Sequence, residues 1–314
     1  MTVDRATHAS SATAIAPIGH GSDSLCCYPP AVNQTRNARI RTMTTADTEP
    51  AAELLRRGDW GERLIFFDWA IDQPTLIPLV AERAGEIVGT GVGSAHGRVG
   101  WVGTIFVAAE RRGSGLGRAV TRAVIDELEA RGCRTLVLIA TSMGRPVYER
   151  EGFTLLDDQD RFSIDGLPAE STPPDPLIRA FRPDDLDAIR ALDAHATGED
   201  RSAILATLVT PSSTWVATDR EGAIRGYLAR APWRGGALIA PDPGDALRLL
   251  EARRHSTGIS GKAAAGIVGG NAIGRERLRA AGWHEEGSGV RMIRGEPLDW
   301  HPEAIWGQFN GALG

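Results

Sequence analysis

A glycine-rich turn is the segment of this sequence whose residue types most clearly suggest chemistry. Its residues are Arg112, Gly113, Ser114, Gly115, Leu116 and Gly117. Glycine lets a backbone approach a ligand closely and adopt positive φ. The turn precedes a segment of helical periodicity, and the first N–H groups of a helix lack helical partners and carry its positive dipole end. We therefore expect an anion site here, with charge added by Arg111, Arg112 and Arg118.

Three nucleotide-binding patterns compete for this turn. A P-loop closes with Gly-Lys before Ser or Thr, whereas this turn closes with Gly117-Arg118. A dinucleotide-binding turn needs a final glycine where Arg118 stands, and an acidic residue after the next strand, where the sequence has Ile139-Ala140-Thr141. The pattern R-x-x-G-x-G is matched in full. A ligand-free connection is the simplest alternative, but three glycines beside two arginines exceed what a connection requires.

Tyr148 is the second residue with a candidate chemical role. It lies in the run ATSMGRPVYEREGF, five residues before Phe153. A phenol with a pKa of about 10 can donate a proton to a leaving group. A tyrosine on a helix is also commonly a half-buried core residue. The residue type alone therefore leaves both interpretations open.

Strands and helices in alternation must position the turn and Tyr148. The best-supported helix has Leu116, Val120, Val124 and Leu128 at helical spacing and Gly132 as its stop. The predicted helices are Glu49–Arg57, Glu62–Ile71, Leu116–Ala130 and Arg145–Glu151. The predicted strands are Ile40–Thr42, Leu79–Ala84, Glu86–Ser94, Trp101–Val107 and Thr135–Thr141.

An internal repeat organises the chain. A strand followed by a helical segment begins at Ala38 and again at Leu177. A glycine turn between strands, and later a glycine-aromatic pair, follow in the same order in each half. These landmarks are Gly85 and Gly222 for the turns, and Gly152-Phe153 and Gly282-Trp283 for the pairs. Four landmarks in one order predict two copies of one α/β unit.

The predicted organisation therefore has four parts. Residues 1–37 lack periodicity and are expected to be a flexible extension, and the Pro- and Asp-rich stretch 166–176 is expected to be a linker. The two copies occupy 38–165 and 177–314.

Composition excludes several classes of function. The formal charge is −5, with 42% hydrophobic and 24% charged residues, so a basic nucleic-acid-binding surface is not expected. No apolar run approaches the ~20 residues of a membrane helix. Three cysteines, Cys26, Cys27 and Cys133, favour a reducing cytoplasmic location over a disulfide scaffold. The seven histidines are scattered without metal-ligand spacing, so no metal site is predicted.

The sequence resembles the GCN5-related N-acetyltransferase (GNAT) superfamily. The run TIFVAAERRGSGLGRAV is similar to that superfamily's coenzyme A motif with its preceding strand, and ATSMGRPVYEREGF is similar to the later segment with the general-acid tyrosine. The resemblance covers 38–165. More weakly, 177–314 is similar to the degenerate second domain of tandem members, through GEDR at Gly198–Arg201 and GVRMIRG at Gly289–Gly295.

The resemblance implies a fold, a cofactor and residue roles. The fold is α/β, with a mixed, mostly antiparallel sheet flanked by helices, in two tandem GNAT-like domains. The backbone of Ile105, Phe106 and Val107 would pair with pantetheine, Arg112–Gly117 would bind the pyrophosphate of acetyl-CoA, and Tyr148 would protonate the leaving thiolate. Many members have Asn where this chain has Thr141-Ser142, so a side-chain contact to pantetheine from this position stays open.

Acceptor and base are less well defined. Because amines are mostly protonated at neutral pH, a base must act, and Asp68, Glu82 and Glu110 are the candidates. On the substrate side, the aromatic-rich segment WGERLIFFDW suggests Trp60 and Asp68, and the second copy suggests Asp200, Arg201 and Arg291. These residues could equally well serve core packing or mutual ion pairs.

The second copy is expected not to react. Its phosphate site would open with Pro241-Asp242-Pro243-Gly244-Asp245, where carboxylates occupy the helix dipole end, and Leu278 stands at the tyrosine position. The expected function is therefore transfer of an acetyl group to a primary amine of a small molecule in the first copy. The alternatives are a non-catalytic coenzyme A-binding module and a transferase of longer acyl chains. A homo-oligomer stays open.

Overall fold

The computed structural model describes residues 34–35, 38–168, 175–233 and 235–314. Most of the predicted extension 1–37, with Cys26 and Cys27, and the centre of the predicted linker 166–176 lie outside the described residues. None of the helices in these ranges is long and apolar enough to cross a membrane.

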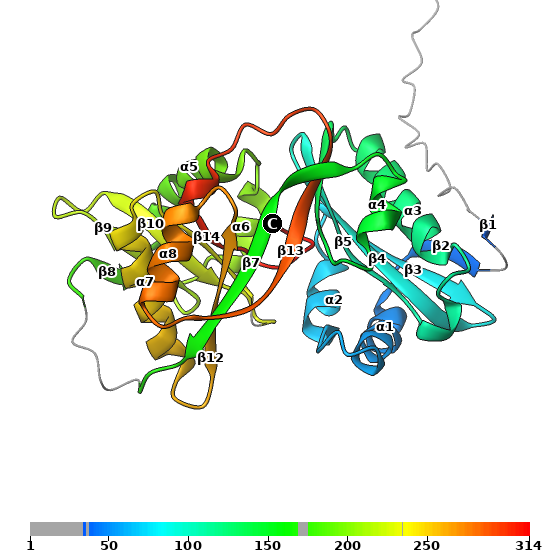
Figure 1. Cartoon of the computed structure of the whole chain (residues 1–314), viewed down its shortest axis with the longest axis horizontal. Helices are drawn as coiled ribbons and strands as arrows, with labels where there is room; N and C mark the ends of the chain where they lie inside the picture. Colours follow the sequence, from blue (N-terminus) through cyan, green and yellow to red (C-terminus); the bar gives the residue numbers. More distant parts are fainter. Residues whose placement is uncertain (1–33, 36–37, 169–174, 234) are drawn as a thin grey trace, which may run out of the picture. The chain divides into compact units, whose positions relative to one another are not determined.

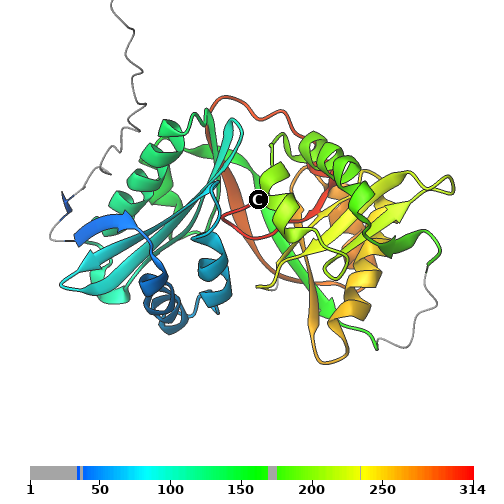
Figure 2. The same ribbon diagram turned by 180° about the vertical axis from the view of Figure 1, so that it is seen from behind.

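Two sheets form the framework of the described residues (Figures 1 and 2). The larger sheet consists, in spatial order, of β1 (Gln34–Thr35), β2 (Ala38–Thr42), β3 (Leu76–Arg83), β4 (Glu86–His96), β5 (Val99–Val107), β6 (Thr135–Ala140), β13 (His284–Gly295), β7 (Thr154–Asp165) and β12 (Lys262–Val268). The smaller sheet consists of β14 (Ile305–Gly307), β11 (Gly236–Ile239), β10 (Ile224–Arg230), β9 (Thr214–Thr218) and β8 (Ile178–Ala180). Pairing is antiparallel throughout except between β5 and β6. The mixed, mostly antiparallel α/β class predicted from the sequence is therefore confirmed.

Helices cover these sheets. They are α1 (Thr45–Arg57), α2 (Leu64–Ala70), α3 (Leu116–Ala130), α4 (Arg145–Glu149), α5 (Leu186–Thr197), α6 (Ser202–Leu208), α7 (Pro243–Thr257) and α8 (Ala272–Ala280). In Figure 1, α3 and α1 lie on opposite faces of the β2–β5 region. Their contacts agree, because Val120 and Val124 of α3 belong to one apolar core and Leu54 and Leu55 of α1 to another. At Gly91 of β4, an added Cβ would lie 2.7 Å from a Val120 methyl group, so glycine permits this close approach of helix and sheet.

The two repeats exchange strands. β7 is the last strand of the first repeat but pairs with β12 and β13 of the second, while β13 pairs with both β7 and β6. Figure 1 shows β7 in green beside β13 in orange-red. The larger sheet is therefore completed by strands of the second repeat. The sequence repeat did not predict this exchange.

The repeat recurs in detail in both halves. The turn glycines Gly85 and Gly222 have φ of 82° and 92°, and Gly152 and Gly282 have φ of 86° and 80°. An arginine-aspartate pair also recurs, with the arginine in β2 or β8 and the aspartate in the segment that follows the strand. Arg41 binds Asp47 at 2.6 and 2.8 Å, and Arg179 binds Asp185 at 2.7 and 2.8 Å.

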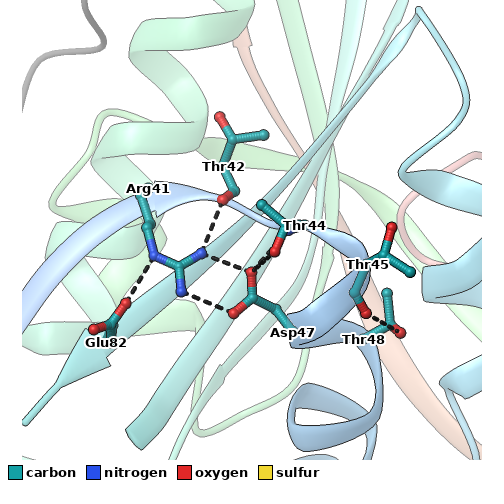
Figure 3. A network of polar contacts seen from close by, with 7 residues as sticks. All are labelled: Arg41, Thr42, Thr44, Thr45, Asp47, Thr48 and Glu82. Carbon is teal, nitrogen blue, oxygen red and sulfur yellow. Dashed lines mark hydrogen bonds and ion pairs between the residues drawn. The ribbon is translucent and has the colours of Figure 1, made fainter. Parts of the chain in front are cut away.

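Figure 3 shows how the first of these pairs anchors the start of α1. The Asp47 carboxylate also accepts the backbone N–H of Thr44 at 2.8 Å, while Arg41 reaches Glu82 of β3 at 2.8 Å. These bonds hold the pKa of the Asp47 carboxyl well below its usual range. The same fixture in both halves ties each first helix to the strand before it.

Candidate active site

The glycine turn presents unpartnered backbone donors. Within the described ranges, the N–H groups of Gly113, Ser114, Gly115, Gly117 and Arg118 form no hydrogen bond. Gly113 and Gly115 have φ of 76° and 86°, and a Cβ added to either would meet nothing within 4 Å. The Ser114 hydroxyl donates to the Arg111 carbonyl at 2.7 Å and so fixes the loop. Five free donors at the start of α3 fit an anion such as a pyrophosphate.

The neighbouring arginines differ in whether a carboxylate already neutralises their charge. Arg112 donates to the carbonyl of Val107 at 3.3 Å and lies 5.7 Å from the ring of Phe106. Arg118 instead forms an ion pair with the buried carboxylate of Glu151 at 2.6 Å. Arg112 is thus the better placed of the two for an anion at the turn, and the charge of Arg118 is offset.

A bulge in β5 bends the strand before this turn. Opposite β4 the register shifts by one extra residue between Gly103 and Phe106. Thr104 takes φ of 52°, and its carbonyl accepts the Thr90 hydroxyl at 2.9 Å. A β-branched residue rarely adopts positive φ, so the bulge is a specific feature of this site.

Beyond the bulge, β5 separates from β6. The two strands pair only from Val99 to Trp101, and no strand in the described chain pairs with the opposite edge of Ile105–Val107. The backbone groups predicted to bind pantetheine therefore lie on an open strand edge, which can accept an extended ligand by β-addition.

A pocket of about 460 Å³ lies at this separation, and we call it the splay pocket. The first repeat contributes Trp60, Arg63, Gly103–Ile105, Ile139–Thr141, Tyr148 and Gln159–Arg161 to its wall. The second repeat contributes Gly235–Gly236, Arg253, Ala264–Gly266, Gly287–Gly289, Gly307–Gln308 and Asn310–Gly311. Residues from both repeats, including both exchanged strands, thus enclose one site.

Tyr148 lies in this wall with its hydroxyl unengaged. The residue is 9% exposed, and its ring packs against Phe153 at 6.2 Å between ring centres. Its hydroxyl forms no hydrogen bond to any described residue. Burial raises the pKa of Tyr148 to about 12, so the phenol stays protonated at neutral pH.

Thr141 follows β6 at the position where the sequence left a side-chain contact to pantetheine open. Its hydroxyl accepts the N–H of Gly144 at 3.2 Å, and the residue lines the splay pocket. The side chain thus closes the turn that leads to α4, the helix of Tyr148.

The predicted substrate residues are only partly brought together. Trp60 lines the splay pocket and contacts Phe106 edge-on at 5.4 Å. Asp68 is exposed on α2 and does not line the pocket. Asp200 accepts the N–H of Ser202 at the start of α6. Only Trp60 of these three lies at the pocket.

Arg201 and Arg291 are both buried. Arg201 binds Asp193 at 2.5 and 2.9 Å, and Asp193 also accepts the Tyr227 hydroxyl. Arg291 lies 5.0 Å from the ring of Trp101 and 4.9 Å from that of Trp300.

Arg291 acts on the pocket through two amides. It donates to Gln159 at 3.2 Å and to Gln308 at 2.9 Å, and both glutamines line the splay pocket. Arg291 can therefore position the pocket wall without lining it.

The three carboxylates considered as bases lie elsewhere. Glu82 and Glu110 line a second pocket of about 650 Å³ beside α1, and Asp68 lines neither pocket. Although the α1 pocket is larger, Tyr148, Gly113, Gly115 and Gly117 do not line it. The carboxylate that does line the splay pocket is Asp160, which forms an ion pair with Arg275 at 2.6 Å.

Sequence reasoning missed Arg253, Gln159 and Gln308 as pocket residues. One signal for Arg253 was available. It follows Ala246, Leu249 and Leu250 at helical spacing on the buried face of α7, where an arginine is unusual. Nothing local marks the glutamines, because strand exchange brings Gln159 to the pocket.

The second repeat lacks the features of the first. Asp242 caps α7 and accepts the N–H groups of Gly244 and Asp245 at 2.8 and 3.1 Å. Leu278, at the position that corresponds to Tyr148, is fully buried. The donors that would hold an anion are thus occupied by a side chain. Across the described ranges, no group of three or more His, Cys, Asp or Glu residues could hold a metal ion.

Comparison with known proteins agrees with this arrangement. The Acetyltransferase (GNAT) family matches residues 39–153, and an Acetyltransferase (GNAT) domain matches residues 189–307. An uncharacterized N-acetyltransferase of Bacillus subtilis, YitH, is 27% identical over 195 residues, which cover 60% of this chain and 68% of that protein.

Solved structures share the fold. A Pyrococcus horikoshii protein, provisionally assigned as an acetyltransferase, has a TM-score of 0.75 at 20% identity and covers 90% of this chain and 98% of its own. A tandem GNAT protein from the clavulanic acid biosynthesis pathway has a TM-score of 0.58 at 15% identity and covers 83% and 99%. The chain therefore belongs to the GNAT acetyltransferase family, with two GNAT domains in tandem. It is an N-acetyltransferase.

Proposed function

We propose that the first repeat transfers an acetyl group from acetyl-CoA to a primary amine of a small molecule, by direct attack within the splay pocket. One observation carries the proposal. The free Tyr148 hydroxyl lies in the same pocket as the open edge of β5. An acyl donor on that edge and an acceptor in the pocket would meet beside a proton donor.

Binding of the donor is the first part of the proposal. The free N–H groups from Gly113 to Arg118 hold the pyrophosphate, with Arg112 beside them. The open edge of Ile105–Val107 exchanges hydrogen bonds with the pantetheine amides. Bound in this way, acetyl-CoA supplies an activated thioester. The second repeat holds no coenzyme A, because Asp242 occupies the corresponding donors.

Tyr148 stabilises the leaving sulfur. A thiol ordinarily has a pKa of about 8.5, roughly 3.5 below the pKa of about 12 of this phenol, so complete proton transfer from the phenol to the thiolate is unfavourable. The hydroxyl therefore acts mainly as a hydrogen-bond donor to the developing thiolate. The thiolate receives its proton in concert with loss of one from the new ammonium group, so the proton count balances.

The positive charge of the pocket assists the amine. Three arginines line it, Arg63, Arg161 and Arg253, whereas its one carboxylate, Asp160, is already paired. A nearby like charge lowers the pKa of an ammonium group. The acceptor therefore loses its proton more readily than in water, and Asp160 or a water molecule can take it.

The test is an acetyl-CoA turnover assay with a panel of small primary amines, read as thiol release and product mass. Transfer in the wild type and its loss in Tyr148→Phe support the proposal. Binding of acetyl-CoA without transfer to any amine would favour a non-catalytic coenzyme A-binding module. Faster transfer from longer acyl-CoA donors would favour the longer-chain transferase.

A further inference from the structure

We propose that the acceptor carries a carboxylate, which Arg253 of the second repeat binds inside the splay pocket. This inference rests on the proposed transfer reaction and names the chemical class of its acceptor. The acceptor is then an amino acid-like molecule, with its amine directed to the thioester and its carboxylate to α7.

Arg253 is a buried cation without a partner. The residue is 6% exposed and lines the pocket. Its guanidinium forms no hydrogen bond or ion pair to any residue that the structure describes. Its side-chain nitrogens are not completely buried, and because the residue lines the pocket, they are accessible from it. Buried charges in proteins are normally paired, so an unpaired one that faces a pocket indicates an absent anion.

The other buried arginines differ from Arg253. Arg201 is neutralised by Asp193 at 2.5 Å. Arg291 is placed between two indole rings and donates to two glutamines. Each therefore has its partners within the protein, whereas those of Arg253 must come from a ligand.

The surroundings of Arg253 increase its need for an anion. Burial, with the nearby Arg230, lowers the pKa of Arg253 to about 10, because each disfavours the charged form. Arg230 itself is held by the Ser256 carbonyl at 3.1 Å. An incoming carboxylate would relieve both effects.

The pocket favours a small zwitterion over a simple amine. Its one carboxylate is paired with Arg275, and its three arginines leave a net positive charge. A purely cationic amine would be repelled, but an amino carboxylate offers the arginine a planar, bidentate partner. The volume of about 460 Å³ suits a small molecule. A single buried guanidinium matches one negative charge, so we assign a carboxylate and not a phosphate dianion.

The experiment compares matched acceptors on matched variants. Each amino carboxylate is paired with its carboxamide, and one aminoalkyl phosphate is included. Arg253→Gln is measured beside Arg254→Gln, which changes the next residue of α7, an arginine bonded to Glu251 and to the Asp165 carbonyl outside the pocket.

In the wild type we expect a higher kcat/KM for carboxylates than for carboxamides. Arg253→Gln should lower kcat/KM for carboxylates by about 10- to 100-fold, mostly through KM, which is the usual loss for a hydrogen bond to a charged group. Carboxamides should change by less than about threefold, and Arg253→Lys should restore part of the preference because it keeps the charge. Arg254→Gln should leave both unchanged.

A second readout separates this inference from the reaction itself. Short carboxylates without an amine should raise the thermal midpoint of the wild type and not that of Arg253→Gln. If no amine is acetylated, the transfer proposal fails, and this shift still tests the carboxylate site. A second outcome is that transfer occurs, carboxylates are not preferred, and Arg253→Gln changes kcat/KM equally for carboxylates and carboxamides. In that case the inference is wrong and the transfer proposal stands. Preference for the aminoalkyl phosphate would overturn the choice of carboxylate. If Arg253→Gln fails to fold, Arg253→Lys replaces it in the comparison. A preference for carboxylates over carboxamides in Arg253→Lys equal to that of the wild type would then contradict the site.

Discussion

Replacing Gly115 by aspartate should abolish acetyl-CoA binding while the protein stays folded. Gly115 precedes α3 with φ of 86°, and an added Cβ meets nothing within 4 Å. The left-handed conformation costs a non-glycine residue about 1–2 kcal/mol. Asp242 caps α7 from an extended backbone with φ of −90°, whereas residue 115 has positive φ, so no comparable cap offsets this cost. The loss of unfolding free energy should therefore stay near this 1–2 kcal/mol, which a folded domain tolerates.

The effect on binding is much larger. A carboxylate at position 115 would displace the ligand from about two of the free N–H donors, and each hydrogen bond to a charged group is worth about 1.5–3 kcal/mol. A loss of at least ~3 kcal/mol corresponds to a Kd about 100-fold or more weaker, before charge repulsion is added.

The matched control lies at the other end of the same helix. Gly132 follows α3 with φ of 88° and open space around its Cβ position. Gly132→Asp carries the same backbone strain and the same charge, and the helix dipole disfavours it further. Calorimetric titration with acetyl-CoA should give wild-type affinity for Gly132→Asp and none for Gly115→Asp, with Gly115→Asn in between. The reasoning is refuted if Gly115→Asp binds within threefold of the wild type, or if Gly132→Asp loses affinity equally.

Four further outcomes are expected. Tyr148→Phe should lower kcat by roughly 10²-fold with little change in acetyl-CoA affinity, because it removes the donor and keeps the ring; an unchanged kcat, with chemistry rate-limiting, would exclude the role. Calorimetry on the intact chain should give one coenzyme A site, and two equivalent sites would contradict the capping argument at Asp242. Arg201→Ala should destabilise the protein by about 3–5 kcal/mol, because it leaves the Asp193 carboxylate buried without its cation. It should not change the preference among acceptors; a changed preference at an unaltered thermal midpoint would place Arg201 at the substrate. Burial raises the pKa of Glu199 from about 4.5 to about 7, so the folded state holds a proton that the unfolded state loses, and stability should fall as pH rises from about 4.5 to about 7. Thermal midpoints across that window should fall less in Glu199→Gln, and an identical pH profile would show that Glu199 is not responsible.

Local structure could be predicted because it depends on local patterns. The helix predicted at Leu116–Ala130 has those bounds in the structure. The first helix begins at Thr45, four residues before the predicted Glu49, because Asp47 caps the segment in a way that periodicity does not reveal. The left-handed glycines and the glycine-rich turn could also be predicted from the sequence, because glycine is the residue that positive φ favours.

The pocket wall could not be predicted in the same way. Which strand lies next to β6 is a long-range choice, and the repeat suggested that each half would keep its own strands. Exchange of β7 and β13 brings Gln159 and Gly289 to one pocket, although they lie 130 residues apart. The sequence suggested Arg201 and Arg291 as substrate residues, but charge alone does not distinguish an arginine with internal partners from one, such as Arg253, that lacks them.

Strand exchange also bears on why a repeat without a cofactor turn is retained. β13 is the strand that pairs with β6, so without it the edge of the catalytic sheet next to the splay pocket would be unpaired. The same strand carries Arg291, which holds Gln159 and Gln308 in the pocket wall. Capping by Asp242 occupies the donors at the start of α7 without disturbing these contacts, because α7 contributes to the pocket through Arg253 instead. The second repeat therefore has donors at the start of α7 that are occupied by Asp242, and it still completes the pocket wall of the first repeat.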